Sequence, residues 1–91
     1  MPKTLHCLVS GRVQGVNFRS WTKGQAEKHG VTGWVRNLAN GRVEVKAQGD
    51  EQVLETFREE LNRGPSAGRV DNLECNFVDE EEEYKKFDVT F

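Results

Sequence analysis

The stretch Gly11-Arg12-Val13-Gln14-Gly15-Val16-Asn17-Phe18-Arg19 joins a short apolar run to a segment with helical spacing. Its glycines allow a sharp turn and the close approach of a ligand to the main chain. Backbone N–H groups in such a turn, or at the start of a helix, favour a bound anion. Arg19 falls in the first turn of the expected helix, where a cation opposes the helix dipole unless an anion lies between them. The stretch therefore indicates either a phosphate-sized pocket or an ordinary strand-to-helix connection.

Regular elements are expected on both sides of this turn. Residues 4–10 are apolar on both faces, which is typical of a central strand. Residues 18–29 carry apolar or small side chains at i, i+3 and i+4 spacing, which predicts a helix that ends at Gly30.

A hairpin is predicted over residues 33–47, where alternating apolar residues are interrupted by Asn40-Gly41. A two-residue turn would pair Arg36 with Val45 on one face of the sheet, which mixes a charged with an apolar residue. A three-residue loop pairs Val35 with Val45 and is the register we expect, with Gly41 in the left-handed region.

The second half of the chain predicts one more helix and two more strands. Asp50 is expected to cap a helix that stops at Gly64-Pro65, and residues 70–78 and 87–91 alternate as strands do. The order is β-α-β-β-α-β with a short final strand. This order predicts an α+β ferredoxin-like sandwich, an antiparallel sheet with two helices on one face, as a single domain over residues 1–91.

Composition limits the class of protein. No apolar run approaches the roughly 20 residues of a membrane span, and the N-terminus lacks the apolar segment of a signal peptide. We expect a soluble, cytoplasmic protein with no membrane partner. Because the cytosol is reducing, Cys7 and Cys75 are expected to be free core thiols; a bridge between neighbouring strands is the alternative.

Charge is divided unevenly along the chain. Residues 1–43 carry seven basic groups and one acid, whereas residues 44–91 carry six basic groups and fourteen acids. The half with the glycine loop would attract small anions unless the two halves cancel in space. The run of acids at 79–83 is expected to be a solvated turn rather than a metal site, because consecutive carboxylates fan out around the chain.

Two stretches resemble the signatures of the acylphosphatase family. Residues 11–19 resemble its phosphate-binding loop, and Gly33-Trp34-Val35-Arg36-Asn37 resembles its second signature. Smaller similarities at residues 41–45, 48–49 and 64–65 extend the resemblance over nearly the whole chain, and the family has the fold inferred above. One departure is Asn17, at a position where an aromatic, small or apolar residue is expected.

The resemblance implies hydrolysis of an acyl phosphate to a carboxylate and inorganic phosphate. Arg19 is implied as the phosphate ligand and Asn37 as the group that orients the attacking water. Backbone amides would complete the cradle, those of Gln14, Gly15, Val16, Asn17, Phe18 and Arg19.

These residues suit that chemistry. The leaving carboxylate has a conjugate acid with a pKa of roughly 4, so it departs without a general acid, and neither motif contains Asp, Glu or His. Without carboxylates near the loop, no metal and no cofactor are expected. The expected partner is a small-molecule acyl phosphate, and inorganic phosphate is expected to be both the product and a competitive inhibitor. The protein is expected to be a monomer.

Three other readings compete with this enzyme. The first is a non-catalytic anion-binding or regulatory domain of the same fold. The second is RNA binding on the open sheet face, which is disfavoured because the chain is acidic and its central strands offer Cys7, Val43 and Val45 rather than aromatics. The third is a module like that found in larger carbamoyl-transfer maturation proteins.

Overall fold

Strands and helices follow one another in the expected order, β-α-β-β-α-β with a short final strand. The structure is a computed structural model, and it describes residues 2–91. Its elements are β1 (Lys3–Arg12), α1 (Phe18–His29), β2 (Thr32–Asn37), β3 (Val43–Gly49), α2 (Glu51–Arg63), β4 (Arg69–Val78) and β5 (Phe87–Thr90).

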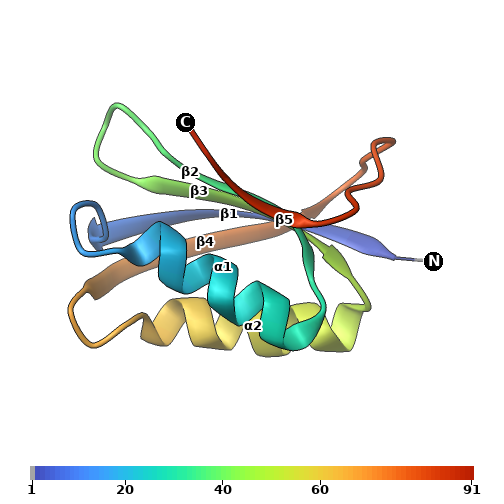
Figure 1. Cartoon of the computed structure of the whole chain (residues 1–91), viewed down its shortest axis with the longest axis horizontal. Helices are drawn as coiled ribbons and strands as arrows, with labels where there is room; N and C mark the ends of the chain where they lie inside the picture. Colours follow the sequence, from blue (N-terminus) through green and yellow to red (C-terminus); the bar gives the residue numbers. More distant parts are fainter. Residues whose placement is uncertain (1) are drawn as a thin grey trace.

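The five strands form one sheet in the order β4-β1-β3-β2-β5, and both helices cover the same face of it (Figure 1). The ferredoxin-like fold and the central place of β1 are therefore confirmed. One pairing differs from the expectation: β5 runs parallel to β2, so the sheet is mixed rather than wholly antiparallel. The direction follows from topology. The chain reverses once after β4, so β5 is antiparallel to β4, and β2 has that same direction.

The core lies between the sheet and the helices. One face of β1 and β3 packs against Phe18, Thr22 and Ala26 of α1 and against Leu54, Phe57 and Leu61 of α2. Cys7, Val43 and Val45 belong to this buried face, so the expectation that they form the open face is wrong. The open face instead carries the alternating residues, among them His6, Trp34, Glu44 and Lys46.

The β2–β3 hairpin has the expected register, with Val35 opposite Val45. Leu38 N–H donates to Arg42 O at 2.8 Å and closes a three-residue loop in which Gly41 has a φ of 90°. At α2, Asp50 occupies the N-cap position, but its side chain makes no capping hydrogen bond, so the predicted cap is formed in position only.

Cys7 and Cys75 are joined by a disulfide, so the expectation of free thiols is wrong and the bridge between neighbouring strands is the correct alternative. The two residues lie directly opposite each other in the β1–β4 ladder, with their Cα atoms 4.1 Å apart. Alternation alone could place both on the covered face, but the register that brings them together is a property of the folded sheet.

Candidate active site

The connection between β1 and α1 has a backbone suited to an anion. Gly15 and Asn17 both have positive φ, 76° and 61°, and Val16 between them does not. Alternation of left-handed with ordinary backbone turns successive N–H groups toward one side and forms a concave nest. The backbone geometry of this connection is therefore compatible with a bound anion.

The N–H groups of this connection are available. In the described chain, no hydrogen bond has a backbone N–H of residues 14–19 as its donor. The first bond of α1 runs from Trp21 N–H to Asn17 O at 2.9 Å. The N–H groups before Trp21 are therefore the unpaired donors of a helix start, where the helix dipole adds positive potential.

The backbone conformation explains why asparagine occupies position 17. Its φ of 61° and ψ of 25° lie in the left-handed region, which costs most L-residues free energy but which asparagine tolerates. Its side chain makes no capping hydrogen bond, so it leaves the N–H groups of the helix start unoccupied. The departure from the expected aromatic, small or apolar residue thus fits the backbone at this position.

Arg19 extends from the first turn of α1 toward the end of β5. Its Nη1 donates to Thr90 O at 3.1 Å, and its Cζ lies 5.0 Å from the centre of the Phe91 ring. Among residues 2–91 no carboxylate lies within salt-bridge distance of this guanidinium. The guanidinium is held by a neutral carbonyl and an aromatic ring, and no carboxylate of the described chain forms a salt bridge with its positive charge.

Asn37 is the last residue of β2. Its Oδ1 atom is buried and accepts no hydrogen bond from the described residues, which is uncommon for a buried acceptor. A buried acceptor of this kind is suited to receive a hydrogen bond from a small bound molecule such as water.

These groups come together at one end of the sheet. Figure 1 shows the loop after β1, the β2–β3 hairpin and the end of β5 on the same side of the molecule. Arg36 of β2 pairs with Thr90 of β5, and the Thr90 carbonyl accepts the hydrogen bond from Arg19. Asn37 is the next residue along β2 after Arg36, so it lies near this contact. The Gln14 side chain spans the remaining gap, because its Nε2 donates to Leu38 O and Arg42 O, each at 2.8 Å.

Sequence reasoning missed two features of this arrangement. It assigned Gln14 only a backbone amide, and it gave the last two residues of the chain no part in the site. The position of Gln14 within the loop signature was a signal for the first. No local sequence pattern indicated that β5 would pair in parallel with β2.

Arg36, although it lies in the second signature, serves another contact. Its Nε donates to Glu44 Oε1 at 2.6 Å, and His6 Nε2 lies 2.6 Å from Glu44 Oε2. Burial raises the pKa of Glu44, but the hydrogen bonds with His6 and Arg36 outweigh burial and leave that pKa below its usual value. Arg36 is thus neutralised on the open face, separate from the charge of Arg19.

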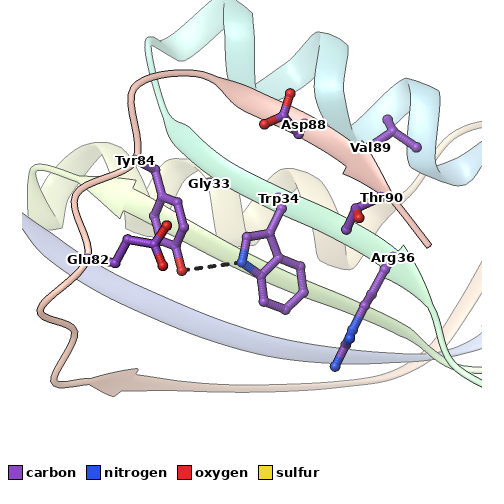
Figure 2. A pocket seen from close by; sticks show the side chains of 8 residues that line it. All are labelled: Gly33, Trp34, Arg36, Glu82, Tyr84, Asp88, Val89 and Thr90. Atoms are coloured by element: carbon purple, nitrogen blue, oxygen red, sulfur yellow. Dashed lines mark hydrogen bonds between the residues drawn. The ribbon is translucent and has the colours of Figure 1, made fainter.

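A shallow hollow of about 470 Å³ lies beside β2 and β5, and Figure 2 shows its lining. Trp34 Nε1 donates to Tyr84 Oη at 3.3 Å across it. Its lining includes Thr90, which accepts the hydrogen bond from Arg19, but neither Arg19 nor Asn37, so the hollow borders this contact without containing either residue.

Within residues 2–91, no group of three or more His, Cys, Asp or Glu side chains is placed to hold a metal ion. No helix in the described part of the chain combines the length and apolar character needed to cross a membrane.

Comparison with known proteins identifies the family. The family model described as acylphosphatase matches residues 5–89. The chain belongs to the acylphosphatase family. It is 47% identical over 87 residues to the acylphosphatase of Koribacter versatilis, covering 96% of this chain and 79% of that one.

Solved acylphosphatase structures agree with this assignment. The acylphosphatase from Bacillus subtilis superposes with a TM-score of 0.94 at 33% identity, with full coverage of both chains. HypF from T. kodakarensis also matches, with a TM-score of 0.86 at 30% identity, but the match covers 98% of this chain and only 12% of HypF. The resemblance seen in the two sequence signatures is therefore confirmed.

Proposed function

We propose that this chain hydrolyses acyl phosphates at the cradle formed by residues 14–19, with Arg19 as the phosphoryl ligand and Asn37 as the residue that orients water. Membership of the acylphosphatase family gives the reaction: an acyl phosphate is cleaved to a carboxylate and inorganic phosphate. The observation that carries the roles is that the unpaired N–H groups, the uncompensated guanidinium and the orphaned Asn37 Oδ1 share one end of the sheet.

Binding of the phosphoryl group follows from the donors present. Arg19 offers a planar fork that can bond two phosphoryl oxygens, and the loop N–H groups offer donors to the others. A metaphosphate-like transition state needs such charge stabilisation and in-line placement more than covalent help. Positioned donors of this kind would be strongest for the charge that develops on the phosphoryl oxygens.

Asn37 would orient the nucleophile. Its Oδ1 can accept a hydrogen bond from water, and its amide group can donate to another oxygen. A carboxamide is too weak a base to remove the proton, so the phosphoryl group is the acceptor we propose for it. No general acid is needed, because the leaving carboxylate is stable as an anion.

The metal-free mechanism is a prediction from the same donors. Arginine and backbone N–H groups would neutralise the phosphoryl charge that magnesium neutralises in many phosphoryl-transfer enzymes. We also propose that inorganic phosphate inhibits competitively, that residues 1–91 form one catalytic domain and that the protein acts as a monomer. A cytoplasmic location is proposed too. Because the cytosol keeps thiols reduced, Cys7 and Cys75 should then be reduced in vivo, and the Cys7–Cys75 disulfide found intact in cells would contradict this location.

Hydrolysis of benzoyl phosphate, with inorganic phosphate as competitor, tests the proposal. Wild type should turn over and be inhibited by phosphate, and Arg19→Ala should lose most of both. Lys28→Ala is the matched control: it removes an exposed cation of the same charged half from the opposite end of α1, and activity should stay within about threefold. Phosphate binding without turnover in wild type would instead support the rival, a non-catalytic anion-binding domain.

A further inference from the structure

The Gln14 side chain connects the phosphate loop to a distant part of the chain. Its Nε2 donates to Leu38 O and Arg42 O, 24 and 28 residues further on. Both bonds are 2.8 Å long, so both amide hydrogens are used. In the described chain, no other hydrogen bond joins residues 13–17 to residues 38–42.

The two acceptors sit at a critical place in the β2–β3 hairpin. Leu38 N–H donates to Arg42 O, so Leu38 and Arg42 form the last pair before the loop. Leu38 also directly follows Asn37. The Gln14 carboxamide therefore fixes the carbonyl next to the residue that would orient water.

We propose that Gln14 is a positioning residue, which holds the end of β2 at a fixed distance from the phosphate cradle and so places Asn37 against the bound phosphoryl group. This inference rests on the proposed roles of Arg19 and Asn37. A displacement of about 1 Å in a reacting arrangement can lower the rate about 100-fold. Without the carboxamide, the cradle keeps Arg19 and its N–H groups, but Asn37 loses its tie to them.

The chemistry of the contact explains the residue type. Two carbonyl acceptors need two N–H donors from one short side chain, and a primary carboxamide supplies both. Glutamate would present only acceptors, and asparagine is one methylene shorter. Methionine matches glutamine in length but donates no hydrogen bond, so Gln14→Met removes the tie and keeps the packing volume.

Gln48 provides a matched control. Its Nε2 also donates twice, to Thr4 Oγ1 at 3.1 Å and to Glu82 O at 2.7 Å, and so also joins separate segments. It lies at the opposite end of β3 from the hairpin loop, opposite Thr4 of β1. Gln48→Met removes these two bonds and a third, in which Tyr84 N–H donates to Gln48 Oε1 at 2.9 Å, at a site remote from the cradle.

The experiment measures kcat and KM for benzoyl phosphate, the inhibition constant of phosphate, and the urea midpoint of unfolding for both variants. Both variants should unfold at lower urea concentration. Only Gln14→Met should lower kcat, by about 10–100-fold, with the phosphate constant within about threefold of wild type. If Gln14→Met does not fold, Gln14→Asn should give a smaller loss of kcat with the same pattern.

A double-mutant cycle with Asn37→Ala separates this inference from the proposed function. If Gln14 acts through Asn37, Gln14→Met should slow the Asn37→Ala enzyme by less than about twofold. The inference is overturned if kcat of Gln14→Met stays within twofold of wild type, if Gln48→Met loses as much kcat, or if phosphate affinity falls with kcat. An Asn37→Ala enzyme as fast as wild type would instead refute the proposed role of Asn37.

Discussion

Reduction of the Cys7–Cys75 disulfide is expected to lower the free energy of unfolding by about 4 kcal/mol. The bond joins residues separated by 68 positions and therefore closes most of the chain into one loop. In the chain-entropy account, a loop of this length removes roughly that much conformational freedom from the unfolded state. Cys7 of β1 is almost fully buried and Cys75 is partly buried against the core, so the thiols should stay packed in the reduced native state.

Urea unfolding with and without a phosphine reductant measures this loss of free energy. In thermal unfolding, reduction should lower the midpoint by roughly 15–30 °C. The variant with both Cys7→Ala and Cys75→Ala is the control, because reductant should leave its midpoint unchanged. Benzoyl phosphate turnover well below the midpoint should be the same in both redox states, since neither sulfur lies in the cradle. A loss of less than about 1 kcal/mol in wild type would refute the loop-closure reasoning.

Three further outcomes follow from the structure. Asn17→Ala should destabilise by about 1 kcal/mol in urea because its backbone is left-handed, whereas Asn17→Gly should be nearly neutral; equal losses would contradict the backbone explanation. The lowered pKa of Glu44 means that its contacts with His6 and Arg36 stabilise the fold above the ordinary carboxyl pKa and lose effect as the pH falls through the lowered value. Glu44→Gln should therefore cost about 1 kcal/mol at pH 6 and progressively less in acid, and a difference independent of pH would contradict this. Turnover should be unchanged in excess EDTA, and loss that Mg²⁺ restores would disprove the metal-free mechanism.

Much of the fold could be predicted because local signals and global topology agree. The glycine after His29, the Asn40-Gly41 turn and the period of the apolar residues each lie in the element that they favour. Long-range pairing could not be predicted in the same way. The Cys7–Cys75 bond and the parallel β5 depend on register and on strand order, and neither is written in a local period.

The site was predicted in part for a similar reason. The two signatures named Arg19 and Asn37, and their order and spacing made the family resemblance specific. Side-chain contacts between distant segments were beyond that reasoning, because hydrogen bonds such as those from Gln14 and Arg19 reach carbonyls that any residue could provide. The left-handed backbone at Asn17 also became visible only in the structure, although asparagine is favoured there.

The division of labour between Arg19 and Asn37 is tested most directly by measuring phosphate affinity and benzoyl phosphate turnover on the same samples. An NMR titration gives the dissociation constant of phosphate for wild type, Arg19→Ala and Asn37→Ala. Both variants should lose at least about 100-fold in kcat, but only Arg19→Ala should lose phosphate affinity, by about tenfold or more. Equal loss of phosphate affinity in both variants, or unchanged affinity and turnover in Arg19→Ala, would contradict the proposed site.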